Sequence, residues 1–520
     1  MNGGLSKGNR YLLAGAGAIG LLLAGTPAAK AQNLQEIQAQ INAMQATIKS
    51  LEKQVQDAKA QASEAKTAAA EGGKSDLDLK VKWKGAPEFS SGDGEFKMKI
   101  RGRIMADYNG IDQDERITGE GDISAVELRR ARLGVEGVVF HDWKYKFEVD
   151  FAADEVAIKD AYVAYNWGNW AFNGVGLKTS EIRVGNQYTY NSLEQTTSSR
   201  FITFMERASF TEAFFLDRQI GAAILAGGEH WSFQTGYYGA TSGENGGVLG
   251  QENWDDDQTA FLVRGTVAPI NREVNGVHQV LHVGGSYRHR DAGNLRLCGQ
   301  VVCLNDEGEV EESGLYQYRA RGADLHLADR FVDSPNFSGE DDMFILEAAF
   351  VWGPFSMQGE YAELEASGIR PSLLDDTNLN SAVNPTYSGY YVDASLYLTG
   401  ETRNYEASTG EFGRTKVKNP VFGGSGGWGA WQIAGRYDVI DLSDKDAAMN
   451  LAYGCSECGE QETWLIGLNW LMTDYTAIKL QVAQSKITGG NNAPRGTLSG
   501  FNRNDGAEIT GVGVRAQVDW

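Results

Sequence analysis

The segment SLEQTTSSRFITFMERASFTEAFFLDRQIG, residues 192–221, separates two stretches with the alternation of β-strands, which start near Glu181 and Gln219. Its large apolar residues are Phe201, Ile202, Phe204, Met205, Phe210, Phe214 and Phe215. So many apolar side chains argue against disorder, and long loops inside compact folds are usually functional. The segment also carries Arg200, Arg207 and Arg218. We therefore expect this loop to fold back into the mouth of a barrel and to bring its arginines there.

The composition narrows the class of protein. The chain has 520 residues, with 64 Gly, only 9 Pro and a formal net charge of −22. No internal stretch of about 18 apolar residues occurs, which argues against a helical membrane protein. Short alternating segments separated by Gly, Asn and Asp clusters indicate an all-β protein. So acidic a chain is a poor partner for nucleic acid.

The N-terminal residues 1–31 have the form of a secretory signal peptide. Lys7 and Arg10 are the positive region, an apolar run follows from residue 11 to residue 25, and Ala29-Lys30-Ala31 is a small-x-small cleavage site. We therefore expect an exported chain, in which the four cysteines meet an oxidising compartment.

Residues 32–71 have the heptad pattern of a coiled coil. The a and d positions are Leu34, Ile37, Ile41, Met44, Ile48, Leu51 and Val55. Isoleucine at both kinds of position favours three helices over two. A lone amphipathic helix lying on the protein is the alternative. Residues 72–94 are glycine-containing and polar, and they are predicted to be a linker.

From residue 95 to the C-terminus the period changes to two, which predicts β-strands. The predicted strands start near Phe96, Val126, Trp143, Ile158, Glu181, Gln219, Trp231, Thr259, Val280, Asp342, Phe355, Tyr390, Trp428, Thr463, Tyr475 and Glu508. Short and long connections alternate between them, as in outer-membrane barrels. A long connection at 401–427, on the side of the short turns, breaks this pattern.

The last strand decides between a soluble sandwich and a membrane barrel. Val512, Val514, Ala516 and Val518 alternate with polar residues, and the chain ends on Trp520. A final amphipathic strand that ends on an aromatic residue is the expected form of an outer-membrane barrel. The prediction is an all-β, sixteen-stranded antiparallel transmembrane β-barrel, preceded by a short N-terminal coiled-coil helix.

The chain resembles a known family at this point, the phosphate-selective porins O and P. The matching motifs are LRRARLGV (128–135), WKYKFEVDF (143–151), KDAYV (159–163), LEQTTSSRFITFMER (193–207), GEFGR (410–414) and GGWGAW (426–431). The resemblance covers most of residues 97–520. It implies a trimeric, sixteen-stranded porin of the Gram-negative outer membrane, often with an N-terminal coiled coil, and an anion path lined by basic residues.

Period-two alternation independently turns many basic residues toward the lumen. The predicted anion path comprises Lys97, Lys99, Arg101, Arg103, Arg130, Arg132, Arg183, Arg200, Arg207, Arg218, Arg264, Arg288, Arg436 and Arg515. Arginine suits this task because its guanidinium is permanently charged and binds phosphate oxygens bidentately. The alternative for each of these residues is a salt bridge inside the lumen, with acids such as Glu136, Glu148, Asp150 or Asp438.

The narrowest point is predicted at Arg200 and Arg207, with Arg101, Arg103, Arg130 and Arg132 facing them across the lumen. In the competing interpretation, Arg200 and Arg207 are locked onto Glu194 and Glu206 and only fix the loop. The leading hypothesis is passive diffusion of phosphate or similar small anions. The alternatives are a weakly selective general porin and a structural tether whose coiled coil reaches across the periplasm.

The remaining motifs indicate neither an enzyme nor a cofactor. Gly423–Gly427 matches a nucleophile-elbow string but lacks the strand–turn–helix context that it needs. The cysteines form two close pairs, Cys298 with Cys303 and Cys455 with Cys458, which we expect to be loop disulfides. A metal or redox site at Cys455-Ser-Glu-Cys458 is the alternative.

Overall fold

The computed structural model describes residues 42, 45–46, 48–57, 59–60, 79–83, 85–113, 122–152, 156–168, 176–239, 258–292, 297–298, 301–302, 316–334, 338–368, 384–424, 426–444, 457–489, 491–492, 502–503 and 506–520. The chain divides into two compact units, Met1–Asp78 and Leu79–Trp520. The predicted signal peptide and most of the predicted coiled coil lie outside the described residues. Most of the predicted linker, residues 72–94, is described, and it contains two short strands where no secondary structure was expected.

In the first unit, residues 48–57 are helical. The heptad positions Ile48, Leu51 and Val55 in this helix are each more than half exposed. Among the described residues, no helix is long and apolar enough to cross a membrane.

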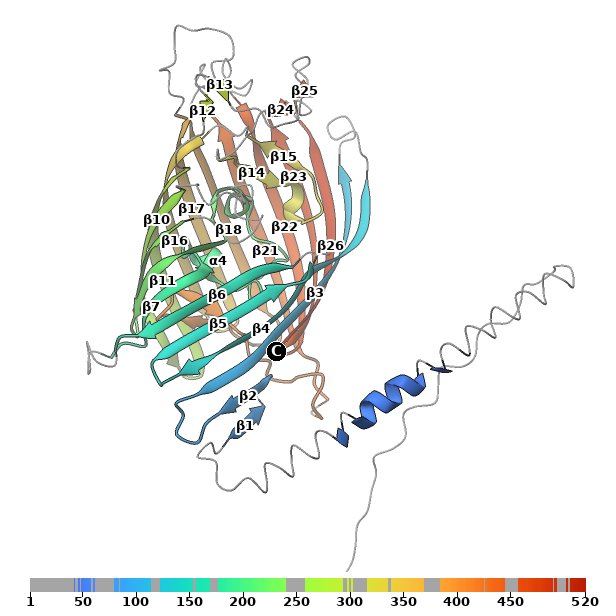
Figure 1. Cartoon of the computed structure of the whole chain (residues 1–520). Helices are drawn as coiled ribbons and strands as arrows, with labels where there is room; N and C mark the ends of the chain where they lie inside the picture. Colours follow the sequence, from blue (N-terminus) through green and yellow to red (C-terminus); the bar gives the residue numbers. More distant parts are fainter. Residues whose placement is uncertain are drawn as a thin grey trace, which may run out of the picture. The chain divides into compact units, whose positions relative to one another are not determined.

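Within the described part of the second unit, sixteen strands form one closed antiparallel sheet (Figure 1). They are β3 (Lys97–Gln113), β4 (Ile123–Val139), β5 (Trp143–Asp150), β6 (Ala157–Asn166), β7 (Thr179–Tyr188), β8 (Arg218–Gly227), β9 (Trp231–Tyr238), β10 (Thr259–Val274), β11 (Val277–Asp291), β16 (Ser338–Trp352), β17 (Phe355–Gly368), β18 (Thr386–Tyr397), β21 (Ala430–Ser443), β22 (Glu457–Thr473), β23 (Thr476–Thr488) and β26 (Glu508–Asp519). Each strand pairs with the next in this order, and β26 pairs with β3 to close the barrel. The predicted sixteen-stranded barrel is confirmed.

The strand starts follow the sequence prediction closely. The largest difference is at β22, which was expected near Thr463 and begins at Glu457. A small hairpin of β1 (Lys80–Trp83) and β2 (Pro87–Ser90) continues the sheet beyond the barrel. It pairs through β2 with the first residues of β3, which precede the β3 residues that pair with β26.

The distribution of side chains across the barrel wall is the inverse of that in a soluble protein. In β26 the outward residues Val512 and Val518 are each 37% exposed, whereas the inward Arg515 is completely buried. Apolar residues also face outward at Ile182 and Val184 of β7. A barrel with an apolar exterior and a polar interior is the arrangement that a bilayer requires.

One side of the barrel has tight turns. Residues 353–354 join β16 to β17, and Asn275-Gly276 joins β10 to β11. Asn275 and Gly276 have φ angles of 52° and 76°, as a two-residue type I′ turn requires. The other side has the long connections, among them residues 189–217 and 292–337. The predicted alternation of short and long connections is therefore present.

Two of the long connections fold into the lumen and form a core there. Residues 189–217 contain α4 (Leu193–Thr196) and α5 (Ser209–Phe214). Residues 316–334 contain β14 (Arg319–Arg321), η2 (Gly322–Asp324) and β15 (Arg330–Asp333). The buried core members from these segments include Phe204, Met205, Phe210, Phe214, Leu325 and Phe331, which cluster with wall residues such as Met343, Leu364 and Tyr391.

The long connection that breaks the predicted pattern, residues 398–429 between β18 and β21, also folds inward. It contains the hairpin β19 (Asn404–Glu406) and β20 (Glu411–Gly413). Tyr405 and Phe412 pack in a buried cluster with Leu193 of α4. The backbone N–H of Phe412 donates to Thr197 Oγ1 at 3.2 Å. The inward-folded loop and the turn-side insertion therefore meet inside the barrel.

The cysteine prediction is testable by mass. Cys458, at the start of β22, is disulfide-bonded, while its expected partner Cys455 lies outside the described residues. In the other predicted pair, Cys298 belongs to the short strand β12 (Leu297–Cys298), which pairs with β13 (Val301–Val302), and Cys303 lies outside the described residues. The intact mass of the mature protein should lack two hydrogens for each of two disulfides. Alkylation of all four thiols without prior reduction would refute this.

A buried ion pair of the wall gives a second prediction. Glu347 accepts from Arg264 Nη2 at 2.7 Å and from the backbone N–H of Leu193 at 2.7 Å. Glu347→Ala leaves Arg264 without a described carboxylate partner, and breaking a buried pair from one side typically costs about 3–5 kcal/mol. We expect a lower unfolding midpoint in detergent. Glu363→Ala, on the exposed face of β17, is the control and should stay within about 0.5 kcal/mol. Equal midpoints for the two variants would contradict the prediction.

Candidate functional site

Two large cavities lie in the part of the lumen that the structure describes. The larger has a volume of about 890 Å³ and is lined by parts of β3 to β8, by the loop 189–217 and by the segment 316–334. The smaller, of about 700 Å³, lies at the starts of β3 and β5, against the insertion 398–429 and Trp520. Lys146 and Tyr162 line both cavities. The two cavities therefore adjoin at these residues, and we refer to the two together as the path.

Both cavities are basic. The larger is lined by fourteen Arg and Lys residues against nine Asp and Glu residues, and the smaller by seven against three. Lys97, Lys99 and Arg101 line the smaller cavity. Arg103, Arg130, Arg132, Arg183, Arg200, Arg207 and Arg218 line the larger cavity. Ten of the fourteen predicted path residues thus lie on the cavities.

The other four predicted path residues, Arg264, Arg288, Arg436 and Arg515, do not line either cavity and are almost completely buried. Arg264 binds Glu347, and Arg288 binds Asp341 at 2.9 Å together with the carbonyl of Phe214. Arg436 binds Asp393 and Glu194, and Arg515 binds Asp107 at 2.6 Å together with the carbonyl of Met205. These guanidinium groups fasten the inward-folded segments to the wall.

The loop 189–217 is fixed by the wall mainly through its own backbone. Lys479 donates to the carbonyls of Ile202 and Phe204 at 2.6 and 3.3 Å. Ser192 caps α4, with its side chain accepting from the N–H of Gln195. The buried ammonium group of Lys479 thus satisfies two loop carbonyls, as buried polar groups require. The arginines of the loop are thereby held at defined positions.

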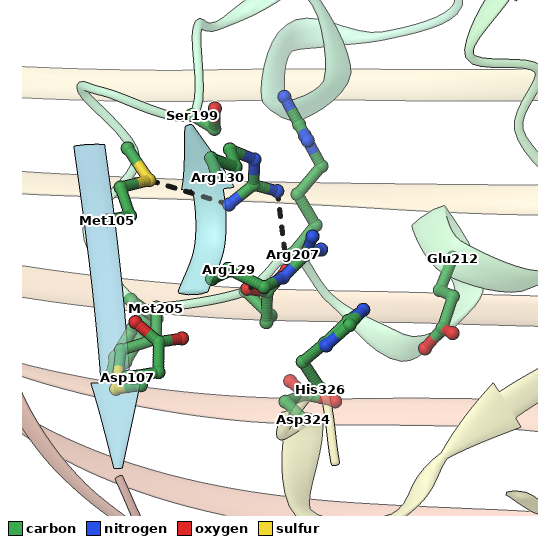
Figure 2. A network of polar contacts seen from close by, with 12 residues as sticks. Met105, Asp107, Arg129, Arg130, Ser199, Met205, Arg207, Glu212, Asp324 and His326 are labelled. Atoms are coloured by element: carbon green, nitrogen blue, oxygen red, sulfur yellow. Dashed lines mark hydrogen bonds and ion pairs between the residues drawn. The ribbon is translucent and has the colours of Figure 1, made fainter. Parts of the chain in front are cut away.

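A β-bulge in β4 supplies two adjacent arginines to the same cavity. The register between β3 and β4 shifts between Met105 and Ala106, so that Arg130 pairs with Met105 and Leu128 pairs with Ala106. Arg129 is the extra residue, and both Arg129 and Arg130 line the cavity. Figure 2 shows Arg130 between Met105 and the loop that carries Ser199 and Arg207. A bulge re-aims a side chain in this way without interrupting the strand.

The lining arginines differ in how completely carboxylates neutralise them. Arg132 binds Asp150 at 2.7 Å and Glu148 at 3.1 Å. Arg183 binds Glu181 at 2.7 Å, Arg218 binds Asp160 at 3.1 Å, and Arg101 binds Glu136 in the smaller cavity. The proposed alternative of lumen salt bridges therefore describes these four residues.

Arg207, Arg130, Arg103 and Arg200 form a second group, with weak carboxylate pairing or none. Arg207 donates to the backbone carbonyls of residues 194, 195 and 197 at 2.9–3.2 Å, and no carboxylate among the described residues forms an ion pair with it. The carboxylates nearest to the other three lie 3.7 Å away: Glu206 from Arg130, Glu148 from Arg103 and Asp519 from Arg200. We name this group, Arg103, Arg130, Arg200 and Arg207, the open arginines.

The alternative in which Glu194 and Glu206 neutralise Arg200 and Arg207 does not match these contacts. Glu194 binds Arg436, and Glu206 binds Arg129 and Arg515. Arg207 uses the carbonyl of Glu194 and not its carboxylate. Glu194 and Glu206 therefore bind wall arginines, which leaves Arg200 and Arg207 to the cavity.

The pKa values of the loop residues follow from burial and charge. Burial lowers the pKa of the Arg200 guanidinium, although Asp519 acts in the opposite direction. Burial, together with nearby Asp438, raises the pKa of Asp324 well above its ordinary value. The Asp324 carboxyl is therefore less readily ionised than an exposed aspartate. An entering anion would relieve part of the unfavourable environment of Arg200.

Several lining residues were not among the predicted path residues. They are Arg129, Lys146, Lys159, Arg290, Arg319, Arg321 and Arg330 in the larger cavity, and Lys144, Arg414 and Lys416 in the smaller one. Arg129 falls on the outward face in strict alternation. The motif LRRAR nevertheless indicated an irregularity in this strand, because a charged side chain such as Arg129 is unfavourable on the lipid-facing side of a membrane barrel.

A closed barrel with an apolar exterior, an inward-folded loop and a basic path defines the protein as an outer-membrane channel. The chain belongs to the family described as phosphate-selective porin O and P, whose profile matches residues 98–520. The family and the outer-membrane location expected from the sequence are thereby confirmed.

Two relatives and one solved structure are similar to this chain over most of its length. An uncharacterized protein of Caulobacter vibrioides is 29% identical over 406 residues, 77% of this chain and 70% of that protein. Porin O of Pseudomonas aeruginosa is 28% identical over 421 residues, 79% of this chain and 87% of that protein. The solved anion-selective porin from Comamonas acidovorans is 12% identical, with a TM-score of 0.47, and covers 82% of this chain and 100% of that one.

Proposed function

We propose that this porin conducts phosphate or similar small anions passively, and that the open arginines form its filter. The observation that carries the proposal is the incomplete pairing of Arg103, Arg130, Arg200 and Arg207 in a cavity where Arg132, Arg183 and Arg218 are closely paired. Basic side chains without close acids bind an oxyanion by charge-assisted hydrogen bonds. The paired arginines keep the path polar without adding strong binding sites.

The larger cavity adds geometric support. Arg103 and Arg130 project from the wall strands β3 and β4, and Arg200 and Arg207 project from the loop opposite. Ser199, whose hydroxyl accepts from Arg103 at 2.5 Å, lies in the same region. An anion between wall and loop thus meets donors from two sides. Several such contacts in series let an anion pass without being held at one point.

The rival proposal is a weakly selective porin, in which the lumen acids offset the bases. The reversal potential of single channels under a potassium chloride gradient distinguishes the two. Anion preference is expected from the excess of basic residues along both cavities. A reversal potential near zero would favour the weakly selective porin.

The location of the filter is tested by substitution. Arg130→Ala and Arg207→Ala each remove an incompletely paired donor, worth about 1.5 kcal/mol or roughly tenfold in relative anion permeability. Arg101→Ala, which removes an arginine bound to Glu136 in the smaller cavity, is the matched control and should change selectivity less. If Arg200→Ala and Arg207→Ala keep wild-type selectivity while Arg101→Ala and Arg132→Ala lose it, the filter lies at the closely paired arginines of the wall and not at the open arginines.

We also propose that the protein is a trimer, with residues 32–71 as a periplasmic coiled coil. The exposed heptad positions Ile48, Leu51 and Val55 support this, because helices bury such a seam by association. Light scattering of the native detergent extract should give the mass of three chains. Deletion of residues 32–71 should leave the barrel trimer intact. A monodisperse monomer of the full mature chain would contradict the proposal.

A further inference from the structure

Glu206 is the one loop acid that reaches the open arginines among the described residues. It lies next to Arg207 in the inward-folded loop, and its side chain is 17% exposed. The arginines around it come from the wall: Arg129 and Arg130 from β4, both labelled in Figure 2, and Arg515 from β26. A loop carboxylate thus occupies the space between two wall strands and the cavity.

The contacts of this carboxylate are those of a bound oxyanion. Arg129 approaches it with two parallel donors, Nε to Oε1 at 2.9 Å and Nη2 to Oε2 at 3.0 Å. Arg515 Nη2 donates to Oε1 at 2.6 Å, and Arg130 Nη2 lies 3.7 Å from Oε2. Bidentate binding by a guanidinium is also the usual form of phosphate recognition. Glu206 therefore fills, from within the chain, a site suited to a permeating oxyanion.

Without the Glu206 carboxylate, the positive charge of the surrounding arginines would be only partly neutralised. Arg515 is also bound to Asp107, at 2.7 and 2.6 Å. Arg129 and Arg130 have no second carboxylate partner among the described residues. Arg130 also donates a hydrogen bond to Met105 Sδ at 3.6 Å. Neutralising Glu206 would leave two adjacent, uncompensated guanidinium groups at the cavity surface. Such a pair would hold an oxyanion more strongly than the present arrangement.

We propose that Glu206 determines how tightly the path binds its anion, by keeping the Arg129–Arg130 site occupied with its own carboxylate. This inference rests on the proposed anion conduction. In the wild-type channel an oxyanion then binds to Arg130 and Arg207 on the open side and leaves readily. Without the carboxylate, the same anion enters the Arg129–Arg130 fork and is held there.

The charge state of Glu206 agrees with this role. Burial opposes ionisation, but the nearby Arg129, Arg130 and Arg515 outweigh it and hold the pKa of the Glu206 carboxyl well below its ordinary value. The carboxyl is therefore ionised near neutral pH. Its competition with a permeating anion is therefore a permanent property of the channel near neutral pH.

A purely structural role is the competing explanation, in which Glu206 pins the loop to the wall. The loop has other attachments nearby that do not use this side chain. The carbonyl of Met205 accepts from Arg515, the carbonyl of Glu206 accepts from Arg436 at 3.4 Å, and the carbonyl of Ile202 accepts from Lys479. Loss of the carboxylate alone therefore leaves the loop in place.

Substituting Glu206 and substituting Arg129 should shift the block of the channel by phosphate in opposite directions. We would measure the chloride conductance of single channels while adding inorganic phosphate, for the wild type, Glu206→Gln and Arg129→Gln. Glu206→Gln should lower the half-blocking phosphate concentration about fivefold, as expected for one partly screened charge. Arg129→Gln should raise the half-blocking concentration, because the paired donors of Arg129 are lost and the Glu206 carboxylate then binds Arg130. If the pair only pins the loop, both variants shift the value in the same direction.

A matched control separates this site from a general charge effect. Glu212→Gln removes a negative charge from the same cavity, where Glu212 binds Arg321 and Arg330 of the segment 316–334. It should shift the half-blocking concentration less than Glu206→Gln. An equal shift, or no shift for Glu206→Gln, would overturn the inference.

The remaining outcomes are also decisive. If Glu206→Gln does not assemble, a higher half-blocking concentration for Arg129→Gln supports the inference, and an unchanged or lower one overturns it. A wild-type channel without anion preference would refute the proposed function alone, because Glu206→Gln would still acquire block by phosphate.

Discussion

The guanidinium of Arg515 connects closure of the barrel, position of the loop and charge of the path. Arg515 lies directly opposite Asp107 where the last strand pairs with the first, and the two form an ion pair across this seam. The same guanidinium holds the carbonyl of Met205 and the carboxylate of Glu206. The wall therefore cannot close in this register without also presenting a fixed binding partner to the loop.

The lumen illustrates how a protein separates structural from functional cations of the same type. Arg264, Arg288, Arg436 and Arg515 are buried and bind both acids and loop carbonyls, so their charge is used to hold the fold. Burying a charge is unfavourable unless it is paired and hydrogen-bonded, and these four meet that condition. The open arginines are held by backbone carbonyls, hydroxyls or distant acids, so their charge remains available to a solute.

The sequence predicted the wall better than it predicted the roles of the residues on it. Period two located all sixteen strands, because each strand separates lipid from a polar lumen. The same rule placed Arg436 and Arg515 inward correctly, but inward residues divide into those covered by loops and those facing the cavity. That division depends on how residues 189–217 and 398–429 fold inside the barrel, which strand alternation does not encode. Arg129 was missed because the bulge shifts the phase of alternation between residues 129 and 130.

The acids of the lumen belong to the conduction mechanism as much as the arginines do. A channel must bind an anion strongly enough to admit it and weakly enough to release it. If all fourteen basic residues that line the larger cavity were unneutralised, the channel would bind an anion strongly but would not release it readily. Asp150, Asp160 and Glu181 neutralise neighbouring wall arginines closely, and Glu206 does so at the loop. The selectivity of such a path is then set by which arginines are left incompletely paired, and the net charge of the chain carries little information about it.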